Sequence, residues 1–253
     1  VLDLNGTSGL DSGTSFYPFE TLGRLGGGSG GKILNWDMQG SPGNGPAHLT
    51  NPNFFNSGGK PFPGYDDYRA SGLIAGNAPG GGSFGGIGGR PEPTGGIGRA
   101  NTTIPPSGKT YGTPELTHLL AGSGGGGGSK KAGGAGAGAI KIIASGTLTL
   151  GGDIWAVGGQ GGPDGGRAKR SGGSGSGGAV YLKAPRLVIQ TGVSIKADGG
   201  AGATGVNHST DNDWATDGGG NGGAAGGGGR IYLEATQSLV NHASSTHSNF
   251  TAT

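Results

Sequence analysis

The chain of 253 residues contains 67 glycines and no cysteine, carries a formal net charge of +2, and is apolar at only 30% of its positions. The small net charge excludes a general attraction to nucleic acid. The missing cysteine excludes disulfide, thiolate–zinc and cysteine-nucleophile chemistry, and no apolar run reaches the ~18 residues of a membrane-spanning helix. The apolar residues are clustered in strand-length runs and only 13% of residues are charged, which favours a folded chain over a disordered one.

Residues 1–79 are predicted to form an irregular N-terminal segment. Residues 1–4 alternate like a strand, which we expect either to add to the sheet of a neighbouring subunit or to pair within its own subunit. Residues 27–34 resemble a degenerate copy of the repeat described next, and residues 49–68 form an aromatic-bearing loop. Because the sequence starts at Val1 rather than Met, we expect a processed mature chain or a fragment.

Residues 80–240 are predicted to form a glycine-rich β-repeat domain. A unit of alternating aliphatic residues recurs at 138–144, 178–184 and 229–235, each time after a glycine tract. Aliphatic residues two apart are typical of a strand with one buried face. We therefore predict two ladders of stacked side chains. The first holds Ile140, Val180 and Ile231, and the second holds Ile142, Leu182 and Leu233.

The first two copies continue with two further apolar runs, and the last of these ends in Gly-Gly at 158–159 and 199–200. Matching residues stacked along an axis favour an all-β fold of the parallel β-helix or β-solenoid type with glycine-rich loops. The alternative is a β-sandwich with polyglycine-II-like tracts, in which glycine lets backbones approach closely. Trp155 stands where the next copy has Lys196, so we expect it to point outward toward a partner. Residues 241–253 form a Ser/Thr-rich tail.

The order of tracts and strands resembles the glycine-rich modules of large, adhesin-like cell-surface and extracellular proteins. The resemblance runs through 80–86, 111–114, 120–126 and 139–150 and then through the two later copies, and it covers about 80–239. It implies an extracellular β-rich module without catalytic residues.

The carboxylates of Asp211, Asp213 and Asp217 lie on a glycine-flanked loop and are the best candidates for binding a metal. Such an oxygen-rich set suits Ca²⁺, the only cofactor that the sequence predicts, although the spacing differs from that of an EF-hand loop. The alternative is a solvated polar turn. Four N-x-S/T sequons are candidates for glycosylation if the chain is secreted. They begin at Asn5, Asn101, Asn207 and Asn249.

Basic residues precede successive strand copies at equivalent places. They are Lys130, Lys131, Arg167, Lys169 and Arg170. Stacked repeats would gather them in a basic patch that contacts an acidic polysaccharide or an acidic neighbour, and the alternative is a solvated loop.

The sequence does not predict an enzyme. Its five histidines show no ligand or triad spacing, and Asp66 and Asp67 are the only adjacent acids. The first interpretation is an extracellular structural protein, a self-associating subunit of a surface filament, sheath or fibre. The second is an adhesin that binds cell-surface carbohydrate through 49–68 and 211–217, and the third is a polysaccharide-cleaving β-helix enzyme.

Overall fold

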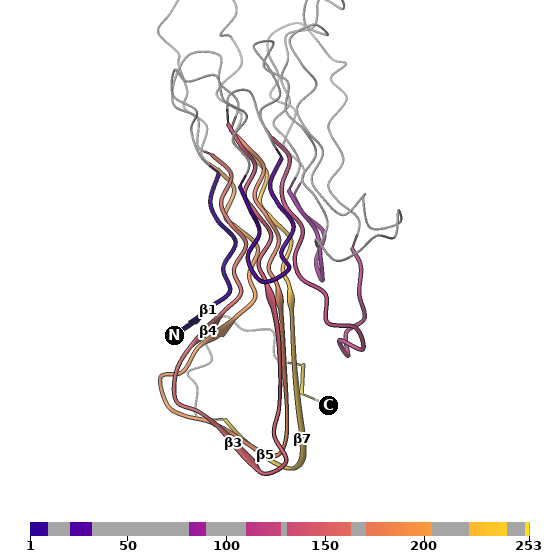
Figure 1. The fold of residues 1–253 in the computed structure, drawn as a ribbon, viewed down its shortest axis with the longest axis vertical. Coiled ribbons are helices and arrows are strands. Elements are labelled where there is room, and N and C mark those ends of the chain that lie inside the picture. The colour runs from indigo at the N-terminus through magenta and orange to yellow at the C-terminus, as the bar shows by residue number, and fades with distance from the viewer. Residues whose placement is uncertain are drawn as a thin grey trace, which may run out of the picture.

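The computed structural model describes residues 1–9, 21–31, 81–89, 110–127, 131–162, 171–203, 223–241 and 251–252. Within these ranges the chain forms short strands and extended glycine-rich tracts, and no helix. The strands gather at one end of the molecule and the tracts run away from them side by side (Figure 1). No helix in the described part of the chain is both long and apolar enough to cross a membrane.

The strands form two parallel sheets that face each other across a triangular outline (Figure 1). One sheet has the order β1-β4-β6, from β1 (Leu2–Asp3), β4 (Ile154–Trp155) and β6 (Ile195–Lys196). The other has the order β2-β5-β7-β8, and β3 also pairs with β5. Its strands are β2 (Ala139–Ile143), β3 (Thr147–Leu150), β5 (Ala179–Ile189), β7 (Arg230–Asn241) and β8 (Thr251–Ala252).

The chain passes through the larger sheet three times along the same path, and the first two passes continue into the smaller sheet. We name the three layers coil 1 (139–155), coil 2 (179–196) and coil 3 (230–241). The predicted ladders are confirmed in register. Ile142 pairs with Leu182 and Leu182 with Leu233, and the first ladder stacks in the same way. Leu182 is fully buried because it lies in the middle layer, whereas Ile142 is half-buried because β2 is the outermost strand.

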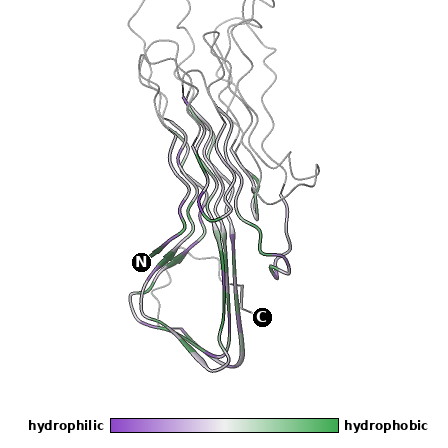
Figure 2. Cartoon of the chain, in the orientation of Figure 1, coloured by the Kyte–Doolittle hydropathy of each residue, from purple (hydrophilic) through white to green (hydrophobic). Residues whose placement is uncertain are grey.

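Apolar side chains from both sheets fill the triangle, and Figure 2 shows this hydrophobic character concentrated on the strands. Coil 2 supplies Val180, Leu187 and Ile189, which have no exposed surface, and β6 supplies Ile195. Alternate residues of a strand point to opposite faces, so Val180 and Leu182 lie on one side, and Leu187 and Ile189 do so again after the register shift between Ala184 and Arg186. The core therefore sits inside the stack of coils.

The glycine tracts pack as helices of three residues per turn. Along 133–138, successive backbone N–H groups donate to three neighbouring tracts in turn, and the order then repeats. The acceptors are, in sequence, Gly31, Gly173, Thr7, Gly28, Ser176 and Leu4. Donors 172–178 likewise cycle through the tracts 156–162, 120–126 and 223–229. This is the period of polyproline II, so the tracts form a polyglycine-II-like bundle.

Glycine is required in this bundle because the backbones touch. A Cβ atom on Gly175 would overlap the carbonyl oxygen of Ala135, and one on Gly178 would overlap that of Gly138. Serine enters the tracts where its hydroxyl can bond a neighbour. Ser174 Oγ accepts from Gly161 N at 3.0 Å and donates to Ala201 O at 2.5 Å.

The described ranges contain the stacked parallel strands that were expected for a β-solenoid. They also contain the polyglycine-II-like tracts that were expected for the alternative, a β-sandwich with such tracts. The β-solenoid class stays a prediction for the chain as a whole. Residues 2–9 and 21–31 bond to the tracts of the repeat region, so they share one body with it; the boundary at residue 79 lies outside the described ranges. The first strand pairs within its own chain, Leu2 opposite Ile154, and β8 brings two residues of the tail onto β7.

Candidate functional site

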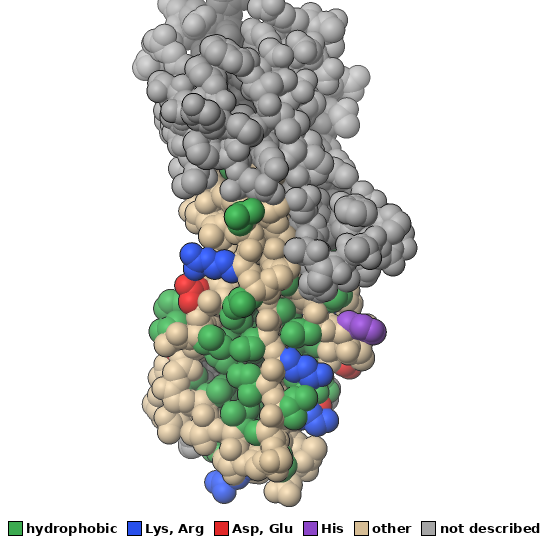
Figure 3. Space-filling model, viewed as in Figure 1, with side chains coloured by type: hydrophobic (Ala, Val, Ile, Leu, Met, Phe, Trp, Pro, Cys, Tyr) green, Lys and Arg blue, Asp and Glu red, His purple; other side chains and the backbone are tan. Residues whose placement is uncertain are grey.

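The outer side of coil 1 carries apolar side chains that no other described strand covers. We call it the coil-1 face and define it by Ile140, Ile142 and Leu148, which pack against the core; Ile143 lies beside them on the outer face of the sheet, like its partner Lys183. Within the described ranges, β2 and β3 pair with β5 on one side and with no strand on the other. Ile143 is 60% exposed, and hydrophobic side chains are visible over the triangular end in Figure 3. The edge thus offers both backbone hydrogen-bonding groups and apolar surface.

The coil-1 face is bare because the layer above it stops short. Residues 21–24 run toward the strands, and the chain then reverses through the positive φ angles of Leu25 (46°) and Gly26 (87°). The Leu25 carbonyl accepts the N–H of Ala139 at 3.3 Å, at the very start of β2. Residues 27–31 then lead away from the strands instead of into one. Within the described ranges this layer therefore covers the tracts and β4, and no strand lies on the outer edge of β2 or β3.

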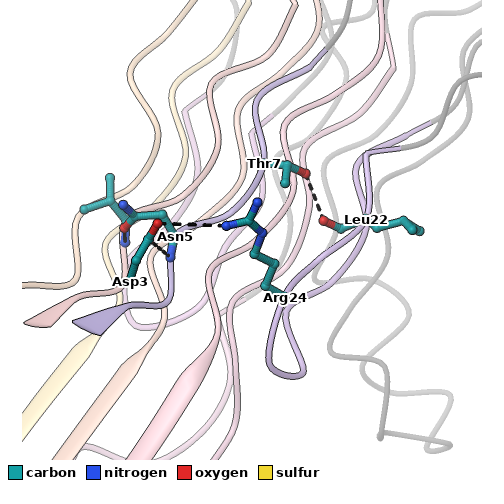
Figure 4. Close-up of polar contacts among 6 residues, drawn as sticks. Asp3, Asn5, Thr7, Leu22 and Arg24 are labelled. Atoms are coloured by element: carbon teal, nitrogen blue, oxygen red, sulfur yellow. Dashed lines mark hydrogen bonds and ion pairs between the residues drawn. The ribbon is translucent and has the colours of Figure 1, made fainter. Parts of the chain in front are cut away.

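Polar contacts hold this incomplete layer in place beside the coil-1 face (Figure 4). Asp3 Oδ1 accepts from Asn5 N at 2.9 Å, and Asp3 Oδ2 lies 3.9 Å from Arg24 across the layer. Asn5 Oδ1 accepts from Val157 N at 2.8 Å, so this sequon residue is tied to the neighbouring tract. The sequons at Asn101, Asn207 and Asn249 lie outside the described residues.

A ladder of aromatic and charged side chains crosses the outer face of the larger sheet, over β2, β5 and β7. The ring of Tyr181 stacks on that of Tyr232 with centroids 5.2 Å apart, and Lys141 Nζ lies 4.5 Å from the Tyr181 centroid on the other side. Glu234 accepts from the Tyr181 hydroxyl at 2.8 Å and pairs with Lys183 at 2.7 Å. This ladder ties coils 1, 2 and 3 together through their side chains.

The protonation of this ladder follows from its contacts. The hydrogen bond from Lys183, followed by that from Tyr181, lowers the pKa of Glu234. The same bond to Glu234 raises the pKa of Lys183. Loss of hydration and then the bond to Glu234 raise the pKa of Tyr181. At neutral pH the ladder therefore holds a carboxylate, an ammonium and a neutral phenol, each in its stabilised form.

A second apolar cluster covers the outer side of β5. Phe84 and Tyr111 pack against each other with ring centroids 4.8 Å apart, and both belong to a cluster with Tyr181. The Tyr111 hydroxyl donates to the carbonyl of Ala121, and burial raises its pKa. Arg230 lies 5.7 Å from the Phe84 ring centroid and donates to Tyr111 O at 3.2 Å. This cluster anchors segments 81–89 and 110–120 on the sheet.

Trp155 and Lys196 occupy matching places, as the repeat predicts. Lys196 Nζ lies 5.3 Å from the ring centroid of Trp155. The indole is half-buried, and its Nε1 atom is buried without a hydrogen-bond partner. The cation therefore lies over the ring that was expected to contact a partner.

The remaining sequence candidates are mostly outside the described ranges. This holds for Asp211, Asp213 and Asp217, for the acid pair at 66–67, and for the basic residues Lys130, Arg167, Lys169 and Arg170. Lys131 is only 1% exposed, so its assignment to a solvent-facing basic patch or loop is wrong. The described ranges hold no group of three His, Cys, Asp or Glu residues placed to bind a metal.

Sequence reasoning missed the coil-1 face. The sequence predicts a degenerate copy of the strand unit at 27–34; residues 27–31 bond to the glycine tracts and form no strand, and 32–34 lie outside the described ranges. Comparisons with protein-family models, with curated proteins and with solved structures found no match.

Proposed function

We propose that this chain is a non-enzymatic structural protein of the cell surface or extracellular space, a self-associating subunit of a filament, sheath or fibre. The observation that carries the proposal is the polyglycine-II-like bundle. Its tracts, from 2–9 to 223–229, are cross-linked by backbone hydrogen bonds in three directions. A body cross-linked through its backbone becomes rigid without a large apolar core, and rigidity is what a fibre subunit needs.

The test is electron microscopy and light scattering of the purified full chain over a range of concentrations. We expect elongated particles whose length grows with concentration. Gly226→Ala, whose Cβ atom would overlap the carbonyl oxygen of Gly175 in the bundle, should reduce growth, and Gly228→Ala, whose Cβ atom would meet nothing within 4 Å, should preserve it. A chain that stays monomeric at every concentration would overturn the proposal.

A second candidate function is a carbohydrate-binding adhesin, which one topological observation favours. The glycine-rich tracts run away from the strands toward the other end of the bundle (Figure 1). In the sequence, the segments 49–68 and 211–217 lie between such tracts, the first between 31 and 81 and the second between 203 and 223. Saturable binding of a polysaccharide by the monomer, lost on deletion of 211–217 with unchanged thermal unfolding, would support this function. Release of reducing ends would instead indicate the enzyme.

A further inference from the structure

We propose that Tyr181 and Tyr232 form a site of oxidative cross-linking, at which a one-electron oxidant of the peroxidase class joins the two rings as dityrosine. The two residues lie directly opposite each other on β5 and β7, which pair in parallel. Their rings are stacked, with centroids 5.2 Å apart and planes inclined by 20°. The register of adjacent strands thus holds two phenols in contact before any oxidant acts on them.

The surroundings of Tyr181 make Tyr232 its partner in the reaction. On the other side of the Tyr181 ring, Lys141 Nζ lies 4.5 Å from the centroid. Tyr111 packs in the same cluster as Tyr181, but its hydroxyl donates to the carbonyl of Ala121, a group that does not take up a proton. Tyr181 is 7% exposed and Tyr232 is half-buried, so an oxidant reaches Tyr232 first and draws the electron of Tyr181 through it.

Glu234 is placed to accept the proton that a neutral phenol releases when it loses an electron. The Tyr181 hydroxyl donates to Glu234 Oε2 at 2.8 Å, within the range of about 2.6–3.2 Å over which a general base takes a proton. The other carboxylate oxygen pairs with Lys183 Nζ at 2.7 Å. This ion pair holds the carboxylate in its ionised form and aims its second oxygen at the phenol.

The reaction oxidises the two tyrosines by two electrons in all. Each phenol loses one electron and one proton and becomes a phenoxyl radical; the Tyr181 proton passes to Glu234 Oε2 and the Tyr232 proton to solvent. A carbon–carbon bond then forms between ring positions adjacent to the two hydroxyl-bearing carbons. The hydrogen on each joined carbon moves to its own oxygen, which restores both phenols. Hydrogen peroxide takes up the two electrons and two protons, its O–O bond breaks, and it leaves as two waters.

The product ties coil 2 to coil 3 by a covalent bond within one chain. The bond closes a loop that contains the tracts 196–203 and 223–229 of the bundle. A cross-link of this kind restricts the unfolded chain, as a disulfide does, and therefore raises the unfolding temperature. Because both rings belong to the same chain, the site does not depend on the proposed self-association.

The test treats the dilute full-length chain with a peroxidase and hydrogen peroxide, followed by dityrosine fluorescence and mass spectrometry of proteolytic fragments. We expect a monomer lighter by two hydrogen atoms, in which a fragment with Tyr181 is joined to one with Tyr232. The fluorescence of the monomer should be lost in Tyr232→Phe and kept in Tyr111→Phe, the matched control. Dityrosine that forms only between chains, oxidised tyrosines that are not joined, or equal fluorescence in Tyr232→Phe would overturn the proposal.

Two further variants examine the proton acceptor. Glu234→Gln should slow the cross-linking by about tenfold or more, because an amide cannot take the proton. Lys183→Met breaks the same ion pair but keeps the carboxylate, so it should leave the rate close to that of the wild type. Equal slowing in both variants would overturn the role of Glu234. Particle growth is measured without oxidant, so failure of the proposed function and failure of this site are separate results.

Discussion

Single carbonyl oxygens decide which glycines of the bundle can be replaced. A Cβ atom on Gly226 would overlap the carbonyl oxygen of Gly175, whereas one on Gly228, two residues along the same tract, meets nothing within 4 Å. We expect Gly226→Ala to lower the free energy of unfolding by about 1–3 kcal/mol, the usual cost of forcing atoms into a packed site. Gly228→Ala should be neutral or stabilising, because alanine restricts the unfolded chain. Thermal unfolding of both variants checks this, and equal midpoints would contradict the close approach.

Glu234 makes the free energy of unfolding depend on pH in the acid range. Its pKa is lowered in the folded chain by Lys183 and then by Tyr181, so its stabilising contribution is complete above the unfolded value of about 4.3. That contribution is lost as the pH falls through the lower folded value. Unfolding midpoints between about pH 6 and pH 2.5 should therefore drop less in Glu234→Gln than in the wild type. Lys183→Met should flatten the same curve, and a curve parallel to wild type would show that the pair does not matter.

At the scale of the element, coil 2 bears the packing of the stack because it has a layer on each side. Leu182→Ala removes a fully buried side chain of its central ladder. We expect a loss of about 2–5 kcal/mol of unfolding free energy, the range for large-to-small core substitutions. Leu239→Ala, at a 38% exposed leucine on β7, is the control and should cost much less. Denaturant unfolding measures both, and similar costs would argue against one continuous ladder.

The loop element that carries Asp211, Asp213 and Asp217 lies outside the described ranges, and its Ca²⁺ site stays a prediction. A cation bound only by the folded chain stabilises it. Melting should therefore occur at a lower temperature in excess EDTA than in excess Ca²⁺, and Asp213→Asn should reduce the difference. Superimposable curves would leave the polar turn as the explanation.

The register of the strands could be predicted from the sequence, whereas polyglycine-II-like tracts were expected only as an alternative and the partners of each tract could not be predicted at all. The pattern of side chains along a strand determines its register, so three copies of one aliphatic pattern were enough to align Ile142, Leu182 and Leu233. Glycine has no side chain to report which neighbour it faces, so the three-residue cycle of partners was invisible. The reversal after 21–24 depends on a positive φ at Leu25, which leucine rarely adopts. The burial of Lys131 depends on the packing of the bundle around it.

At the scale of the whole molecule, local unfolding should be rarer in the bundle than at the edge of the strand stack. Most N–H groups along 133–138 and 172–178 are bonded to tracts far away in the sequence, so exposing them requires several segments to separate together. We expect these amides to be among the slowest to exchange, and those of β3, on the bare edge, to exchange much faster. Mass spectrometry of exchanged peptides measures this, and uniform rates would contradict a cooperative bundle.

The three-residue cycle of partners also sets a rule for how the length of such a protein can change. Removing one residue from a tract turns everything beyond it by about 120°, so each later N–H group would face the wrong neighbour and the carbonyls around it would lose their donors. Removing three residues restores the original facing and only shortens the rod. We therefore expect insertions and deletions within the tracts to be tolerated when their length is a multiple of three residues, because only then does each later N–H group face its original neighbour.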